Sequence, residues 1–325
     1  MLALQLPARG YLVVATCLTT QGAKALADAA EARGITVHGG NGPALTTSGL
    51  QPVLLDVCRD DDVAQLAQRL AVWYPQGVQY VRACAPTRAA LAGGLRSRSA
   101  PSSWRGRGRN GSALVNNAGI GLGGFVEWTS MAQFRRVMDV NYFGTVAMTK
   151  ALLPAIRRRR GRVVNVASMF GRASLQSVSG YCASKYAVEA FSDALRREVW
   201  PFGVDVVLIE PGFAKTPIND IAHAALRKGY DQLPADEQAV YGEEFVRNSV
   251  SAFDEVMQRA QEPQKVVDCM VHAVDAASPR TRYVVGPDAR ALCILNLLPT
   301  WVGDWFSHLS PIWNVMPAQA IYRRR

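Results

Sequence analysis

Short apolar segments alternate with segments of helical periodicity over residues 11–209 of this chain. The apolar segments lie at residues 11–15, 53–55, 113–115, 163–167 and 204–209, and the helical patterns at residues 23–32, 61–73, 131–158 and 181–200. Strands and helices that alternate at this spacing form βαβ units with parallel strands. Residues 163–167 and 204–209 are almost continuously apolar, as expected for strands covered by helices on both faces. The sequence therefore predicts a doubly wound α/β domain.

Two stretches interrupt the alternation. Residues 34–50 are rich in Gly and Thr and are predicted to form a loop or a poor additional strand. Residues 82–111 carry seven Arg and no acidic residue, so most of the net charge of +10 lies in this one stretch of low complexity. Its low apolar content predicts a surface insertion. An Arg/Gly tract with one Trp also suits RNA, but we favour the insertion and predict no nucleic-acid partner.

The cysteines and the apolar stretches exclude some classes of protein. Six cysteines in 325 residues show no CxxC pair and no metal-ligand spacing, so we expect free thiols, mostly buried, and no metal site. No N-terminal export signal is recognisable, because Pro7 stops the short apolar patch before it. The apolar stretch at 291–302 is shorter than the roughly 18 residues that a membrane span needs. Residues 291–325 suit a membrane surface, and their aromatic residues equally suit packing against the domain or a second subunit.

The residues that best predict chemistry are Ser168, Tyr181 and Lys185, with Asn141 upstream. Tyr181 and Lys185 are four residues apart in a helical pattern, which places them on one face of the helix. A nearby ammonium is expected to lower the pKa of the tyrosine and make it a general base for a hydroxyl proton. Ser168 follows the strand predicted at 163–167 and can hydrogen-bond the reacting oxygen. This arrangement predicts oxidation of an alcohol by loss of a proton and a hydride.

A lone YxxxK occurs by chance in many helices, but here further motifs accompany it in order. They are Asn116-Asn-Ala-Gly119 after the strand at 113–115, Val140-Asn141 in a helix, Ser168 thirteen residues before Tyr181, and Glu210-Pro-Gly212 after the strand at 204–209. With these motifs the chain resembles the short-chain dehydrogenase/reductase family, which has a Rossmann-like fold. The resemblance implies that Asn141 holds a water in a proton relay and that Lys185 also binds the nicotinamide ribose.

The same resemblance implies which other residues contact the cofactor. Pro211, Gly212 and Thr216 would border the nicotinamide. Asn116, Ala118 and Gly119 would support the adenosine side, and Asp56 and Val57 would touch adenine. No acidic residue ends the strand at 11–16 to select NAD through the ribose hydroxyls, and no Arg follows closely to attract the 2′-phosphate of NADP. The sequence leaves the two cofactors open, and the resemblance favours NAD.

Longer runs narrow the resemblance to the retinol and hydroxysteroid dehydrogenase branch. These runs are CLTTQGA (17–23), GRVVNVASMFGR (161–172), GYCASKYAVEAFSDALRREV (180–199), FGVDVVLIEPGFAKTP (202–217) and PRTRY (279–283). The branch implies a bulky apolar alcohol or ketone as substrate, a retinoid or a steroid, and an association with the endoplasmic reticulum membrane. It places the domain at residues 1–290, with a substrate lid at 213–262 and a C-terminal segment at 291–325. The aromatic residues of 213–262 equally suit ordinary helix core.

The chain departs from the family at its start. Family members open with a strand followed by TGxxxGxG, whose glycines let the backbone approach the cofactor pyrophosphate. If residues 12–15 form the first strand, only Gly22 of that motif is kept. If the CLTTQGA run is aligned with the branch, residues 11–16 form the second strand, residues 1–11 end the first helix, and the first strand and glycine loop are absent. We favour the second alignment, which predicts a sheet without its first strand.

This departure leaves a second hypothesis about function. A chain without its phosphate-binding loop suits a catalytically impaired family member that acts as a binding or partner protein. The complete set of Asn141, Ser168, Tyr181 and Lys185 favours an active oxidoreductase. A homo-oligomer is compatible with either hypothesis.

Overall fold

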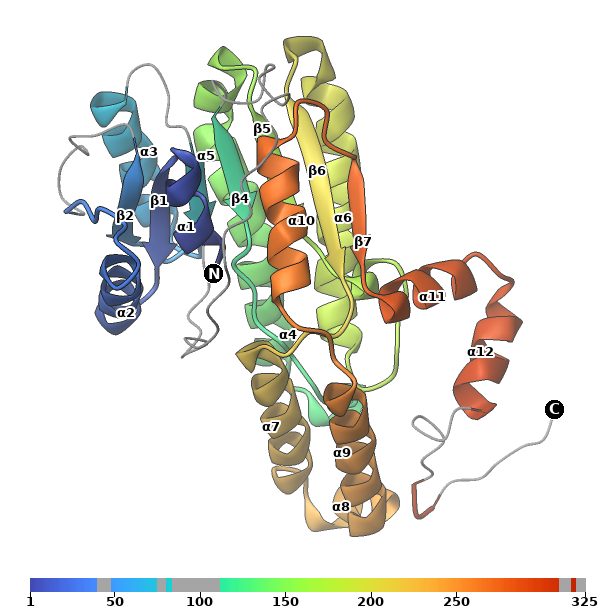
Figure 1. Ribbon diagram of the computed structural model, residues 1–325. Helices are drawn as coiled ribbons and strands as arrows, with labels where there is room; N and C mark the ends of the chain where they lie inside the picture. The colour runs from blue at the N-terminus through green and yellow to red at the C-terminus, as the bar shows by residue number, and fades with distance from the viewer. Residues whose placement is uncertain (40–47, 75–79, 84–111, 310–316, 320–325) are drawn as a thin grey trace.

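The computed structural model describes residues 1–39, 48–74, 80–83, 112–309 and 317–319. In these residues a single sheet of seven strands has the order β2-β1-β3-β4-β5-β6-β7, and every neighbouring pair is parallel (Figure 1). The strands are β1 (Leu12–Cys17), β2 (Gly49–Leu54), β3 (Tyr80–Ala83), β4 (Ala113–Asn116), β5 (Arg162–Val166), β6 (Asp205–Pro211) and β7 (Arg282–Val285). The predicted doubly wound α/β fold is confirmed.

One α-helix precedes β1, and the others lie between the strands or after the last of them. They are α1 (Leu2–Gln5), α2 (Thr20–Glu31), α3 (Asp60–Trp73), α4 (Met131–Met138), α5 (Gly144–Arg158), α6 (Ser179–Val199), α7 (Pro217–Asp231), α8 (Ala235–Tyr241), α9 (Glu243–Gln258), α10 (Gln264–Asp275), α11 (Pro287–Leu295) and α12 (Thr300–Leu309). Figure 1 shows α7, α8 and α9 grouped at one end of the sheet and α12 standing apart from it.

The strands bury side chains on both faces of the sheet. Val13 packs with residues of α1, α2 and α10, whereas the next residue, Val14, packs with residues of α3, α5 and α6. On β5, Val164 packs in the same cluster as Val13, and Val163 packs in the same cluster as Val14. Successive side chains of a strand point to opposite faces, so the continuous apolar runs in the sequence fill two separate layers of core.

The expected gap at the first strand is filled. In the common doubly wound order 3-2-1-4-5-6, the first strand lies between strands 2 and 4. Here β1 lies in the second position and β3 lies between β1 and β4, with Val14 paired to Val81 and Val81 to Leu114. This register supports the alignment in which residues 11–16 are a second strand. The prediction of a sheet without its central strand is wrong, because a segment from later in the chain takes that place.

Two other segments differ from their predictions. The helix predicted at 131–158 is divided by a π-helical turn (Asp139–Phe143) into α4 and α5. The stretch at 34–50 contributes a bridge between Val37 and Leu50, and β2 begins at Gly49. Most of the predicted insertion at 82–111 lies outside the described residues, although its first two residues belong to β3.

Arg162 links the start of β5 to the end of α10. Its Nη1 donates hydrogen bonds of 2.7, 2.9 and 2.9 Å to the carbonyl oxygens of Ala273, Val274 and Ala276. The last carbonyls of a helix have no partner within the helix, and a cation at this end also interacts well with the helix dipole. Burial lowers the pKa of the guanidinium below its usual value. The buried charge therefore holds α10 against the sheet.

Replacing Arg162 with Met is expected to lower the free energy of unfolding by about 3 kcal/mol, because three carbonyls lose a charged donor. Urea unfolding followed by circular dichroism measures this change. Arg158→Met at the exposed end of α5 is the matched control, with an expected change below about 0.5 kcal/mol. Equal effects of the two substitutions would show that Arg162 does not anchor the helix.

Candidate active site

The predicted site residues follow three neighbouring strands at their carboxyl ends. Asn116 is the last residue of β4, Ser168 lies two residues after β5, and Gly212 follows β6. The carboxyl ends of parallel strands lie at the same edge of a sheet, where ligands bind in open α/β folds. The fold therefore brings together residues that are almost a hundred positions apart in the chain.

Helix α6 carries Tyr181 and Lys185 into this edge. Gly180 lets the first turn of α6 lie close to its neighbours, because a Cβ there would come within 2.9 Å of Phe134 and Leu122. Lys185 is buried, and its Nζ lies 5.7 Å from the centre of the Tyr181 ring. The same Nζ donates a 2.9 Å hydrogen bond to the carbonyl oxygen of Val166 on β5. The predicted pairing of Tyr181 and Lys185 on one helix face is present in the structure.

Ser168 is buried between β5 and α6. Its Oγ accepts a 3.2 Å hydrogen bond from the backbone N–H of Phe170, which shapes the turn after the strand. Its hydroxyl also hydrogen-bonds the hydroxyl of Tyr181. The two hydroxyls thus face one another beside the lysine.

Burial controls the ionisation of this pair. It raises the pKa of Tyr181 to about 12, although the hydrogen bond with Ser168 acts in the opposite direction. It lowers the pKa of Lys185 to about 8, although the negative charge of Glu189 acts in the opposite direction. The expectation of a lowered tyrosine pKa is wrong for this structure, because the cost of burying a phenolate outweighs the hydrogen bond with Ser168.

Asn141 lies in the π-helical turn between α4 and α5, and its side chain is used within the protein. Its Oδ1 accepts a 2.8 Å hydrogen bond from the N–H of Ile120, and its Nδ2 donates to the carbonyl oxygen of Ile120 and to Oγ of Ser184 at 3.1 and 2.9 Å. π-helical turns of this kind are rare and often occur at functional sites. Asn141 therefore ties the loop after β4 to the turn of α6 between Tyr181 and Lys185.

The residues predicted for the adenosine side lie along the same edge. Asn116 is buried, and its Nδ2 donates hydrogen bonds to Oγ1 of Thr149 and Oδ1 of Asn165 at 3.0 and 2.9 Å. Asp56 follows β2, and its carboxylate accepts a 3.0 Å hydrogen bond from the N–H of Cys58. Val57 is buried against α5, since a Cβ on Gly144 would lie 2.7 Å from it. Val57 thus packs in the core.

The loop after β6 is held by a residue that the sequence did not single out. Asp288 at the start of α11 accepts a 2.6 Å hydrogen bond from the N–H of Phe213. A Cβ on Gly212 would lie 2.2 Å from the same carboxylate, so this position has room only for glycine. The Gly286-Pro-Asp sequence indicates a helix start, but nothing in it indicates a partner 75 residues away.

The aromatic residues predicted for a substrate lid divide into two groups. Tyr230 and Phe245 are buried around Trp128, in a cluster that joins α7 and α9 to the loop before α4. Phe213 instead packs edge-on against Phe170 at 5.5 Å, and Phe170 lies 6.2 Å from the Tyr181 ring. The first group is helix core, whereas the second forms an apolar wall beside Tyr181.

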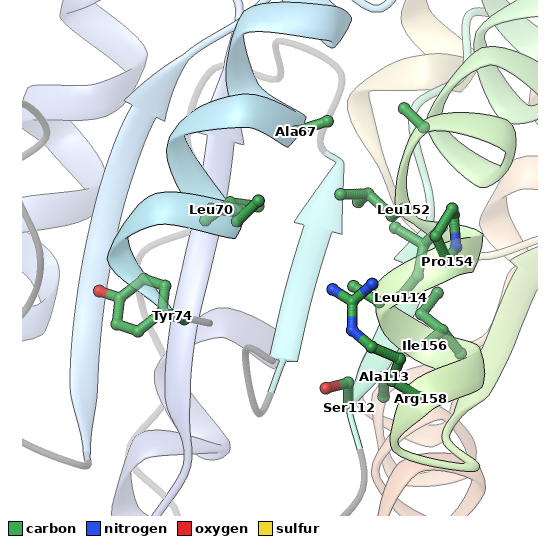
Figure 2. Close-up of a pocket in the computed structure, with 13 residues that line it drawn as sticks. Ala67, Leu70, Tyr74, Ser112, Ala113, Leu114, Leu152, Pro154, Ile156 and Arg158 are labelled. Carbon is green, nitrogen blue, oxygen red and sulfur yellow. The ribbon is translucent and has the colours of Figure 1, made fainter. Parts of the chain in front are cut away.

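A separate cavity of about 150 Å³ lies between α3 and α5, away from these residues. Figure 2 shows Leu70 and Tyr74 on one side of it and Leu152 and Ile156 on the other, with Ser112 at the start of β4. This is the amino end of β4, opposite the edge where Asn116 lies. The cavity is therefore not part of the candidate active site.

Comparison with known proteins agrees with this geometry. The short chain dehydrogenase family profile matches residues 112–227. Retinol dehydrogenase 7 of Mus musculus is 35% identical over 99% of this chain and 86% of its own length, and retinol dehydrogenase 16 of Homo sapiens is 38% identical over 94% and 82%. This chain belongs to the short-chain dehydrogenase family.

A solved structure places this dehydrogenase in the same fold. The short-chain dehydrogenase/reductase of Burkholderia phymatum, in complex with NAD, superposes with a TM-score of 0.60 at 20% identity, over 88% of this chain and 92% of that one. At this identity the likeness concerns the fold alone. It agrees with the doubly wound sheet that the strand pattern predicts.

The nicotinamide half of the dehydrogenase site fits a nucleotide cofactor. A Cβ on Gly119 would lie at van der Waals distance from Nζ of Lys185 and Oδ1 of Asn141, at 3.6 and 3.4 Å, so the backbone at Gly119 runs directly beside both side chains. Nζ of Lys185 makes one hydrogen bond among the described residues, which leaves two of its three N–H groups for ribose hydroxyls.

The pyrophosphate of a nucleotide cofactor has its usual binding position next to the central strand. In doubly wound folds the turn after this strand binds the phosphates. Strand β3 occupies that position and ends at Ala83. Residues 84–111, which follow it, lie outside the described part of the chain.

Among the described residues, no group of His, Cys, Asp and Glu is suited to hold a metal ion. In the same part of the chain, no helix has both the length and the apolar character that a bilayer crossing requires. The five described cysteines are free.

Proposed function

We propose that this chain oxidises retinol to retinal with NAD. The observation that carries the proposal is the convergence of Ser168, Tyr181 and Lys185, with the serine hydroxyl on the tyrosine hydroxyl and the ammonium beside its ring. Two retinol dehydrogenases that resemble the chain over nearly its whole length support the choice of substrate. The apolar wall of Phe170 and Phe213 suits a long hydrocarbon chain next to the reacting alcohol.

We assign a role to each residue of the set. Tyr181 takes the proton of the alcohol as general base, and Ser168 hydrogen-bonds the alcohol oxygen while its C–O bond becomes a carbonyl. Lys185 supplies positive charge next to the phenolate and binds ribose hydroxyls. Asn141 fixes the position of α6 and holds the water to which the proton passes. When bound, NAD would supply the hydride acceptor and a positive charge that favours the phenolate of Tyr181.

The remaining cofactor contacts are proposed from the same edge of the sheet. Pro211, Gly212 and Thr216 border the nicotinamide, and Asn116, Ala118 and Gly119 support the adenosine side. Asp56 contacts the adenine, and Val57, whose side chain packs in the core, contacts it through its backbone. No acidic residue or Arg follows β1 closely enough to choose between the cofactors, so we propose NAD from the branch and keep NADP as the alternative. Binding titrations with NADH and NADPH compare the two directly.

The substrate is tested by comparing retinol with a hydroxysteroid. With NAD present, the purified chain is expected to give a kcat/KM for all-trans retinol at least about 10-fold above that for a 3-hydroxysteroid, a preference within the range that pocket shape supplies. The opposite ratio would make the chain a steroid dehydrogenase. No turnover of either substrate, with NADH bound, would favour the catalytically impaired binding protein, for which the relatives give no support.

We further propose that α11 and α12 rest on a membrane surface, as suits an enzyme of the endoplasmic reticulum membrane with an apolar substrate. Large apolar side chains are exposed along these helices and in the turn between them: Ile294, Leu297, Leu298, Trp301 and Trp305. Leu297 and Trp301 are 77% and 70% exposed, and exposed apolar residues that gather on one surface mark an interaction site. Two exposed tryptophans on a short helix, preceded by two exposed leucines, suit the interface between lipid headgroups and acyl chains.

Replacing both Trp301 and Trp305 with Ser is expected to lower binding to phosphatidylcholine/phosphatidylserine vesicles at least about 10-fold, because the apolar area that enters the bilayer is lost. Sedimentation with vesicles measures the bound fraction. Exposed Trp200, at the far end of α6, provides the control, and Trp200→Ser is expected to bind as the unchanged chain does. Unchanged vesicle binding by the double variant would contradict the proposal. Unchanged vesicle binding together with a smaller assembly on gel filtration than the unchanged chain forms would instead make this surface a subunit contact.

A further inference from the structure

A third ionisable residue lies on the same face of α6 as Tyr181 and Lys185. Glu189 is one helical turn beyond the lysine, and both are buried, at 6% and 4% exposed. Gly171 covers this turn from the side of β5, because a Cβ there would lie 2.8 Å from Cγ of Glu189 and 2.9 Å from the carbonyl oxygen of Lys185. The charges of the two residues are therefore shielded from water, which weakens screening between them. The negative charge of Glu189 acts to raise the pKa of Lys185.

Arg282 on β7 holds Glu189 in place. Its Nη1 pairs with Oε2 of Glu189 and lies 2.5 Å from Oε1 of Glu210 on β6, and its Nη2 lies 2.8 Å from Oδ2 of Asp193 on α6. The other oxygen of Glu189, Oε1, is buried without a hydrogen-bond partner. A buried carboxylate oxygen with no partner is costly, so the position of this residue calls for a role beyond packing.

Other charged groups also face Glu189. Arg172 follows the turn that carries Ser168 and pairs with Oε2 of Glu210 at 3.5 Å. The thiol of Cys293 on α11 interacts electrostatically with the same charged groups. Burial and the neighbouring Glu210 raise the pKa of Glu189 to about 7, while Arg282 and Arg172 act in the opposite direction. The carboxyl of Glu189 therefore changes charge close to neutral pH.

We propose that Glu189 is a positioning residue for the active site: its buried carboxylate, fixed by Arg282, keeps the ammonium of Lys185 charged beside Tyr181. The inference rests on the proposed role of Lys185. It extends the set of Tyr181 and Lys185 to a column of three ionisable groups on α6, of which the third never touches substrate or cofactor. Without the carboxylate, the effect of burial on the pKa of Lys185 is no longer offset by a negative charge, so the lysine loses its proton at a lower pH.

The direct test is the pKa of Lys185, measured from its ¹³Cε chemical shift in [¹³C]lysine-labelled chain. Glu189→Gln keeps the size of the side chain and a hydrogen bond to Arg282, and it is expected to lower the pKa of Lys185 by about one unit. Asp193→Asn removes an equal charge from the same arginine but one turn farther from the lysine, and it is expected to change that pKa by less than about 0.3 unit. Equal shifts in the two variants, or none in either, would overturn the proposal.

The unchanged chain supplies an independent check that needs no variant. The ¹³Cε shift of Lys185 is expected to show a second inflection near pH 7, where Glu189 takes up its proton, and its absence would contradict the proposal. Neither titration depends on turnover, so failure here is distinct from failure to oxidise retinol. In the active enzyme, Glu189→Gln is expected to shift the alkaline limb of the pH profile of kcat to a pH about one unit lower. The KM for retinol is expected to stay unchanged.

Discussion

Tyr181→Phe is expected to lower kcat for retinol oxidation by about 1000-fold or more, because the variant has no group to take the alcohol proton. The fold is expected to remain, because the substitution removes the hydrogen bond with Ser168 but keeps the contact between the ring and Phe170. Steady-state kinetics give kcat, and circular dichroism confirms that the variant is folded.

Tyr186 provides the control for this substitution. It lies on α6 one residue beyond Lys185 but is exposed, so Tyr186→Phe is expected to keep the activity of the unchanged chain within about two-fold. A Tyr181→Phe variant that retained a tenth or more of the activity would remove Tyr181 from the mechanism.

The second large effect is expected at Arg282. Arg282→Ala is expected to lower the free energy of unfolding by about 4 kcal/mol at pH 8, because it leaves the buried carboxylate of Glu189 without its cation and leaves Glu210 with Arg172 alone. Urea unfolding measures the loss. Arg280→Ala, at an exposed position before the same strand, is expected to cost less than about 0.5 kcal/mol.

This loss is expected to depend on pH with a definite sign. In the folded protein the pKa of Glu189, about 7, lies above its ordinary value, so the folded protein binds this proton more readily than the unfolded chain does. The buried negative charge is present above pH 7 and disappears as the pH falls. The difference between Arg282→Ala and the unchanged chain should therefore shrink between pH 8 and pH 5, and a constant or growing difference would contradict the account.

The sequence predicts the fold class and the catalytic set because both depend on local patterns. Continuous apolar runs identify buried parallel strands, and the helical spacing of Tyr181 and Lys185 is enough to place them on one face of α6. The strand before Ser168 similarly ends within one residue of the predicted position. The motifs follow strand ends, and parallel strands bring those ends together.

The sequence fails where an element finds its partner far along the chain. Tyr80–Ala83 lies at the edge of a stretch with the composition of an insertion, and only its pairing with β1 and β4 makes it the central strand. Asp288 and Arg282 act through partners at least 72 residues away. The sequence mispredicts the pKa of Tyr181 for a related reason, since spacing gives the distance to the lysine but does not show how deeply the phenol is buried.

The central claim, that Tyr181 and its neighbours carry out hydride transfer from an apolar alcohol, is tested most directly with retinol deuterated at its carbinol carbon. The purified chain is incubated with NAD and this alcohol, and the products are analysed by mass spectrometry. We expect retinal and NADH in equal amounts, with one deuterium on each NADH, and neither product with Tyr181→Phe. Binding of NADH without formation of retinal by the unchanged chain would contradict the account.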